Sequence, residues 1–67
     1  MARTYEILGY KEKKDFNLGN FIVLDEGITN KRKAIKFAKE LYNNKFHKVI
    51  KVQSSDREFI QILEDKL

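Results

Sequence analysis

The sequence predicts a small α+β two-layer sandwich with the element order ββαβα, in which a three-stranded antiparallel sheet carries helices on one face. Residues 31–44 place apolar side chains at helical spacing. Three short segments, 4–11, 21–24 and 46–53, are rich in β-branched and aromatic residues, as strands are. The 67 residues contain no repeat and no linker, so they are expected to form one domain, 1–67.

The first strand shows an imperfect alternation of apolar residues. Tyr5 and Ile7 lie on one face of an extended chain. Leu8 and Tyr10 lie on the other face, and Gly9 stands between them. An isolated Gly at such a shift of phase is typical of a β-bulge, so we expect a bulge at this Gly.

The second strand is the apolar run Phe21–Leu24, which lies between the turn residues Gly19–Asn20 and the polar residues Asp25–Gly27. A continuous apolar run bounded by turn signals is typical of a strand that is buried on both faces. We therefore expect this strand to be the most buried one and to form an antiparallel hairpin with the first strand. The polar residues 12–15 are expected to belong to the connection between the two strands.

The predicted helix is amphipathic. Its apolar residues fall within an arc of roughly 160° around the helix axis. They are Ala34, Ile35, Phe37, Ala38, Leu41 and Tyr42. The opposite side is polar and carries Arg32, Lys33, Lys36, Lys39, Glu40 and Asn43. Thr29 or Asn30 can serve as the N-cap, and Asn43–Asn44 can provide a left-handed residue that ends the helix.

Two structures remain open for the tail. As a helix, the tail starts with the capping box Ser55–Glu58 and separates apolar from polar residues cleanly. As a strand, residues 58–63 close a hairpin with the third strand, which gives the order ββαββ with four strands and one helix. The strand puts Gln61 on the same face as Phe59 and Leu63, so the helix is preferred and ββαββ is the alternative.

The composition excludes several classes of site. The chain has no Cys and a single His, His47, so disulfides, thiolate metal centres and the usual zinc sites are excluded. Nucleophilic triads need a base beside a Ser, whereas Ser54 and Ser55 lie in a predicted turn or cap, where Ser has a structural role. The three Gly residues are too far apart for a phosphate-binding loop. We therefore expect a protein that is not an enzyme and that holds no metal and no cofactor.

The apolar segments are short. No segment approaches the roughly 20 apolar residues that span a membrane. The N-terminal residues carry charges at Arg3 and Glu6 and lack the apolar region of a signal peptide. We therefore expect no membrane contact and a cytoplasmic location.

The chain carries 14 Lys and Arg against 10 Asp and Glu, which gives a formal net charge of +4. The excess lies on the predicted helix, at Lys31, Arg32, Lys33, Lys36 and Lys39. The first three stand in the first helical turn, where the macrodipole favours carboxylates over cations by about 0.3–1 kcal/mol each. Free N–H groups and cations at a helix N-terminus attract anions, so these residues are the candidates for contact with a phosphate backbone or another polyanion. A solvated face without a partner is the preferred interpretation, because a Lys-rich outer face is ordinary for an exposed helix.

Aromatic residues gather in the first two strands. If helices cover one face of the sheet, the other face exposes some of them, and Tyr5, Tyr10 and Phe21 are then expected to contact a partner protein. Two alternatives remain for the same residues: filling the core of a very small domain, or stacking on single-stranded bases. A core of this size is marginal without disulfides or metals, so a second copy of the chain is a further expected partner, as a homodimer.

These observations together predict a non-catalytic small binding module that acts through a protein–protein contact. A phage or mobile element would use such a module to inhibit or redirect a host protein by covering one of its surfaces. The alternative function is nucleic-acid binding through the basic face of the helix.

Overall fold

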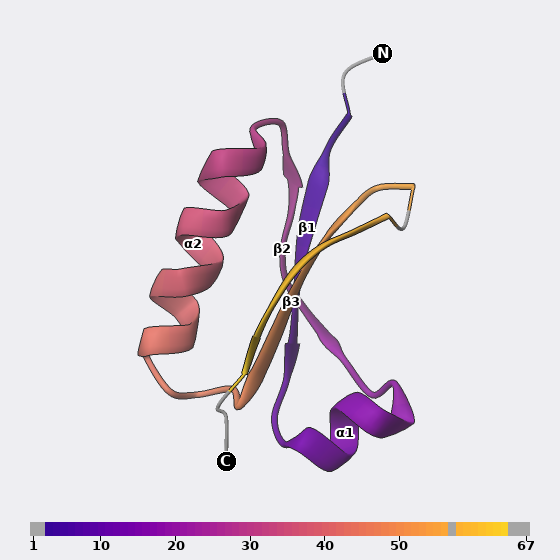
Figure 1. The fold of residues 1–67 in the computed structure, drawn as a ribbon, viewed down its shortest axis with the longest axis vertical. Coiled ribbons are helices and arrows are strands. Elements are labelled where there is room, and N and C mark those ends of the chain that lie inside the picture. The colour runs from indigo at the N-terminus through magenta and orange to yellow at the C-terminus, as the bar shows by residue number, and fades with distance from the viewer. Residues whose placement is uncertain (1–2, 57, 65–67) are drawn as a thin grey trace.

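The computed structural model describes residues 3–56 and 58–64. This part of the chain forms one antiparallel sheet with the strand order β2-β1-β3-β4, together with two helices (Figure 1). In chain order the elements are β1 (Tyr5–Tyr10), α1 (Lys13–Leu18), β2 (Ile22–Ile28), α2 (Lys31–Asn43), β3 (Val49–Ser54) and β4 (Phe59–Glu64). Figure 1 shows α2 along one face of the sheet and α1 at one end of the other face.

The predicted α+β class and the antiparallel sheet are confirmed, and β3 pairs antiparallel with β1. The predicted order ββαβα with three strands is wrong. The described residues form four strands, as in the alternative ββαββ, and add the short helix α1 between the first two strands.

The tail is a strand, because β4 pairs antiparallel with β3 and places Ile50 opposite Leu63. The pairing shifts by one residue between Val52 and Gln53, which is the mark of a β-bulge. The bulge lets Ile60 and Leu63 both pack against the core under α2, although strict alternation would separate them. The position of Gln61 between Phe59 and Leu63, which disfavoured a regular strand, is therefore compatible with a bulged strand.

The helix α1 fills a connection in which the sequence indicated only polar and turn residues. The side chains of Glu12 and Asp15 form a capping box at its start. At its end Gly19 adopts φ 76°, and its N–H group donates to Phe16 O, so the last carbonyls of this helix are satisfied. The ring of Phe16 packs edge-on against Tyr10 at 5.0 Å between centroids, which ties the helix to β1.

Buried side chains come mainly from β1, β3 and α2. Under α2 the core consists of Ile7, Ala34, Ala38, Ile50 and Val52. On the other face a smaller cluster consists of Leu8, Tyr10 and Val49, with Phe16 and Ile62 packed against it. The two faces that the sequence predicted for the first strand are confirmed.

The expectation that Phe21–Leu24 is the most buried strand is wrong. β2 lies at the edge of the sheet, and the side chains of Phe21, Ile22 and Val23 are exposed. An edge strand has a neighbour on one side only, so an apolar run there keeps part of its surface in water. The bulge expected at Gly9 is also absent: the irregularities of the β1–β2 pairing lie on either side of Ile7.

Both ends of α2 are capped. The side chain of Asn30 accepts hydrogen bonds from the N–H groups of Arg32 (2.9 Å) and Lys33 (3.2 Å), as one of the two predicted N-caps. The predicted left-handed stop at Asn43–Asn44 is displaced by one residue, because Asn44 keeps a helical φ of −72° and Lys45 adopts φ 61°.

Candidate interaction surface

The face of the sheet opposite α2 contains a groove of about 550 Å³. α1 covers one end of this face and leaves the rest open. Eight residues from β1, β2, β3 and the connection between α1 and β2 line the groove: Glu6, Leu8, Tyr10, Gly19, Phe21, Val23, Lys51 and Gln53. The groove is therefore built from both central strands and reaches the β2 edge of the sheet.

The groove is apolar at one end and polar at the other. Leu8 and Tyr10 are buried and form its apolar end. Towards the start of β1, Gln53 Nε2 donates a hydrogen bond to Glu6 Oε1 across the strand pair. Lys51, opposite Leu8 in the pairing, is half-buried between the two ends. Such a mixture of apolar surface and polar rim is typical of protein interfaces.

The structure brings together two of the three predicted contact residues. The rings of Tyr10 and Phe21 lie 6.3 Å apart in an edge-to-face arrangement at the groove. Tyr10 is buried, and this burial raises the pKa of its hydroxyl. Phe21 is the exposed member of the pair. Tyr5 lies on the opposite face, half-buried against the core under α2, so it is separated from the groove by the sheet.

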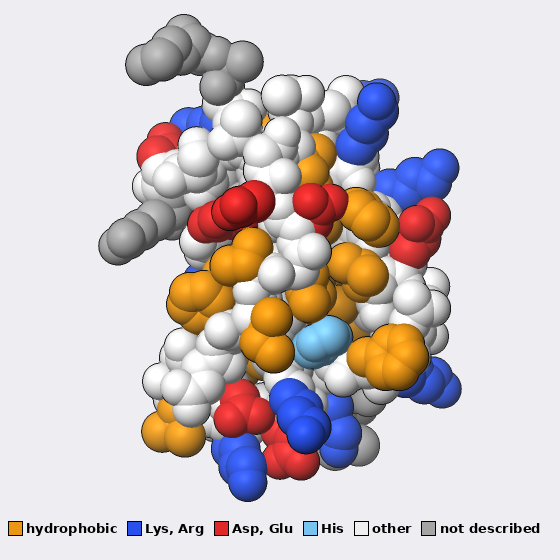
Figure 2. Space-filling view, turned by 180° about the vertical axis from the view of Figure 1, so that it is seen from behind, with side chains coloured by type: hydrophobic (Ala, Val, Ile, Leu, Met, Phe, Trp, Pro, Cys, Tyr) orange, Lys and Arg blue, Asp and Glu red, His pale blue; other side chains and the backbone are white. Residues whose placement is uncertain are grey.

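Next to the groove, the start of β2 exposes a group of large apolar side chains that we call the β2-edge surface. The exposed fractions are 72% for Leu18, 52% for Phe21, 59% for Ile22 and 44% for Val23. Figure 2 views the molecule from the side of β2 and shows hydrophobic side chains gathered in the middle of this face, with acidic side chains above them. Soluble monomers rarely expose a contiguous apolar patch on an edge strand, so this surface is the leading candidate site.

The sequence did not identify Leu18, Ile22 and Val23 as surface residues. For Ile22 and Val23 the signal was the unbroken apolar run that starts β2, and the same run suits a central strand or an exposed edge equally well. Leu18 lies outside this run, just before the turn residues Gly19 and Asn20. Strand order decides between the two, and strand order depends on long-range pairing.

The five cations predicted to bind a polyanion are all exposed on α2: Lys31, Arg32, Lys33, Lys36 and Lys39. None of them forms an ion pair with another described residue. Two N–H groups in the first turn of the helix, those of Arg32 and Lys33, already donate to the side chain of Asn30. The cations therefore form an extended basic face along the helix, and its N-terminal N–H groups are partly occupied.

A second pocket, of about 280 Å³, lies at the C-terminal end of α2 and is lined by Tyr42, Asn43, Lys45, His47 and Lys48. His47 is half-buried and packs over Gly9. The backbone N–H group of Lys48 donates to the carbonyl oxygens of Tyr10 and Lys11, so this pocket lies between the end of α2 and the end of β1.

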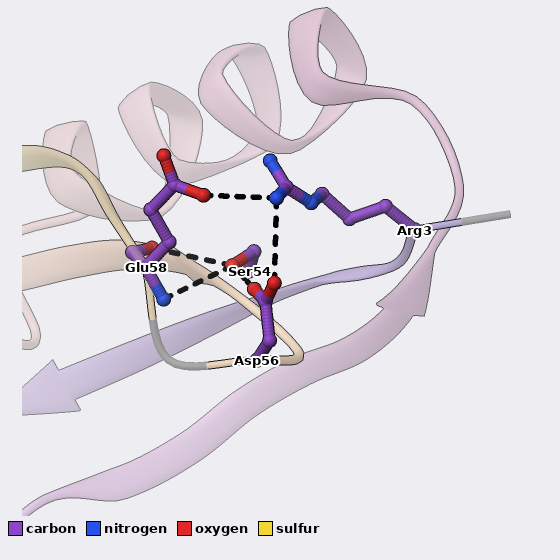
Figure 3. Close-up of polar contacts among 4 residues, drawn as sticks. All are labelled: Arg3, Ser54, Asp56 and Glu58. Atoms are coloured by element: carbon purple, nitrogen blue, oxygen red, sulfur yellow. Dashed lines mark hydrogen bonds and ion pairs between the residues drawn. The ribbon is translucent and has the colours of Figure 1, made fainter.

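A polar cluster joins the N-terminal segment to the turn between β3 and β4 (Figure 3). The buried Ser54 hydroxyl donates to the Asp56 carboxylate and accepts from the Glu58 N–H group at 3.0 Å. Arg3 Nη2 lies 3.3 Å from Asp56 Oδ2 and 2.9 Å from Glu58 Oε2. The hydrogen bond from Ser54, followed by the charge of Arg3, lowers the pKa of Asp56. Every polar group of this cluster has a partner, so its role is to hold the turn.

No protein-family model, no curated protein and no solved structure matches this chain. Within the described residues, neither helix has the length and apolarity needed to cross a bilayer. The same part of the chain holds no group of three or more His, Cys, Asp or Glu side chains arranged to bind a metal ion.

Proposed function

We propose that this chain is a non-catalytic binding module that acts through a protein–protein contact at the β2-edge surface and the adjoining groove. One observation carries the proposal: the successive residues Phe21, Ile22 and Val23 expose large apolar side chains at the edge of the sheet, and Leu18 exposes another at the end of α1. Burying such surface against a partner removes it from water, at about 25 cal/mol per Å². An open strand edge adds main-chain hydrogen bonds to the same contact.

The residues around this edge supply both an apolar anchor and polar groups, as the residues of protein interfaces do. Phe21 is a half-exposed aromatic anchor, and its ring is supported from below by the buried Tyr10. Aromatic anchors that become buried when a partner binds contribute most of the binding energy of protein interfaces. Glu6, Lys51 and Gln53 at the polar end supply hydrogen-bonding groups, which favour one orientation of the partner.

We also propose a biological setting for this contact. A phage or mobile element encodes the module, which inhibits or regulates a protein of the host by covering one of that protein's surfaces. A small domain with an apolar anchor at a strand edge suits that role. Its effect requires binding alone and no chemical step.

Affinity capture with a matched control tests this proposal. The variant Phe21→Ser removes the anchor, and Phe59→Ser removes a phenyl ring of similar exposure, 56%, from the opposite edge of the sheet. We expect the wild type and Phe59→Ser to retain the same partner protein, and Phe21→Ser to bind the purified partner at least about tenfold more weakly by calorimetry. Equal binding by Phe21→Ser would overturn the proposal.

A second function, nucleic-acid binding, is favoured by the five exposed cations of α2 that lack an ion-pair partner among the described residues. Binding to a duplex should then weaken with salt, with a log–log slope of about −0.9 per phosphate contacted. We expect Lys33→Glu with Lys36→Glu to abolish binding. Lys13→Glu with Lys48→Glu changes the net charge equally away from this face and should retain most of it. Equal loss in both double variants would show that net charge, not this face, governs binding.

A further inference from the structure

We propose that the β2-edge surface binds a second copy of this chain, with the two β2 strands paired antiparallel about a two-fold axis at Ile22. The inference rests on the proposed function, since it names a second copy of the chain as one partner of the same surface. It follows from which part of β2 is open, from the faces on which its side chains lie, and from the positions of its charges.

Only the first half of β2 is suited to pairing with another strand. In the second half the pairing with β1 is irregular on either side of Ile7, and Asp25 Oδ1 accepts a hydrogen bond from the Glu26 N–H group at 2.8 Å. Gly27 then adopts φ 72°, which departs from an extended strand. Bulges and charges of this kind protect edge strands against pairing. The unprotected part is therefore the apolar start of the strand.

Geometry limits the register of two identical strands. Antiparallel strands from two copies are related by a two-fold axis perpendicular to the sheet, so residues that face each other lie on the same side of the joined sheet. Phe21 and Val23 line the groove on the open face, whereas Ile22 pairs with Gly9 and lies on the α2 face. A two-fold axis at Ile22 satisfies this condition, because it places Phe21 opposite Val23 of the second copy.

The charges of β2 select this register over those with the axis further along the strand. With the axis at Ile22, apolar residues face apolar residues and Asp25 faces the uncharged Gly19. An axis at Asp25 would place this carboxylate opposite its own copy, and like charges facing each other destabilise a strand pair. An axis at Val23 or Leu24 would place Asp25 opposite Phe21 or Val23, which leaves a carboxylate against an apolar side chain.

The resulting dimer continues the sheet across both copies and brings their grooves together at Phe21 and Val23. Both α2 helices then lie on one face of the joined sheet, and the apolar surface of Ile22 becomes central. The opposite edge is less suited to this contact, because Phe59 is the one large apolar side chain that β4 exposes. Other small domains gain stability from disulfides. This chain of 67 residues has no Cys, and self-association supplies stability in their place.

Sedimentation velocity on the purified chain over a range of concentrations measures the dimer directly. We expect a monomer–dimer equilibrium with a Kd on the order of 100 µM, as for contacts of small area. Ile22→Lys should raise the Kd at least about tenfold, because two ammonium groups meet at the axis. Phe59→Lys, on the other edge, should leave it unchanged. A wild type that stays monomeric at about ten times that Kd overturns the inference.

Single cysteines test the register, since the chain contains none of its own. Under mild oxidation we expect Ile22→Cys to cross-link to itself, because facing Cβ atoms in a strand pair lie about 4.5–5.5 Å apart, near the disulfide range. Phe21→Cys and Val23→Cys should cross-link when mixed with each other and much less alone. Faster cross-linking of Val23→Cys alone than of Ile22→Cys would overturn this register.

The two proposals fail in distinguishable ways. A monomeric chain whose capture of another protein still depends on Phe21 overturns the dimer and leaves the proposed function standing. A monomeric chain that captures another protein equally well with and without Phe21→Ser overturns both the dimer and the proposed function.

Discussion

Leu24 lies directly over Gly9. A Cβ atom on this glycine would stand 2.7 Å from Leu24 Cδ1 and 2.9 Å from His47 Cδ2, closer than carbon atoms approach without overlap. Glycine is otherwise unfavourable inside a central strand, because it loses backbone entropy and buries no side chain. Its place in β1 therefore depends on the close approach of Leu24 and His47, which pack between the sheet and the end of α2.

Gly9→Ala should destabilise the fold by about 1–2 kcal/mol, because the added methyl group overlaps Leu24 and His47 and forces them to shift. Chemical denaturation measures the free energy of unfolding. In a Leu24→Ala background one of the two overlaps is gone, so the same substitution should cost less there. An equal cost in both backgrounds would contradict this explanation of the glycine.

Lys45→Gly should stabilise the protein by roughly 0.5–1 kcal/mol. Lys45 is exposed and adopts φ 61°, where a Cβ atom costs about 1–2 kcal/mol. Part of the gain is offset by the extra freedom of glycine in the unfolded chain. Lys48→Gly is the matched control, since Lys48 is exposed without a left-handed φ, and it should give no gain in urea or thermal unfolding. A gain in both variants would point to charge instead of backbone strain.

Ser54→Ala should raise the pKa of Asp56 towards its ordinary value, because the hydrogen bond from Ser54 is the main cause that lowers it. Arg3→Ala should raise it less. A carboxylate with a lowered pKa in the folded state contributes stability above its unfolded pKa, and this contribution is lost as the pH falls through the folded pKa. The stability difference between wild type and Ser54→Ala should therefore narrow below about pH 4.

Carboxyl chemical shifts followed by NMR over a pH titration report the Asp56 pKa in each variant. Urea unfolding at neutral and acidic pH reports the stability difference. A larger pKa change in Arg3→Ala than in Ser54→Ala would show that the ion pair, and not the hydrogen bond, governs this carboxylate.

Phe16→Ala should destabilise the fold by roughly 2 kcal/mol, because Phe16 is the ring that α1 packs against Tyr10. Leu18→Ala, in the same helix, removes a side chain that is 72% exposed and should change the stability by less than about 0.5 kcal/mol. Thermal unfolding followed by circular dichroism compares the two. Similar losses would mean that helix propensity, and not the ring contact, determines the stability of α1.

Several features follow from the order of residues alone. The apolar spacing from Ala34 to Tyr42 has the period of a helix, and Asn30 precedes it as an N-cap, so α2 was predicted with its end residues nearly right. Tyr5 and Ile7 against Leu8 and Tyr10 gave the two faces of β1. These features depend on neighbours within a few residues, which a local pattern records.

The tertiary structure decided what local patterns leave open. Phe59–Glu64 became a strand because a bulge beside β3 changes the phase of its side chains, and β3 is distant in the sequence. Phe21, Ile22 and Val23 became exposed because β2 lies at the edge of the sheet, although the same run would be buried in a central position. Strand order depends on pairing between distant segments, so the sequence determined the elements of this protein and the tertiary structure determined which apolar surface remains available to a partner.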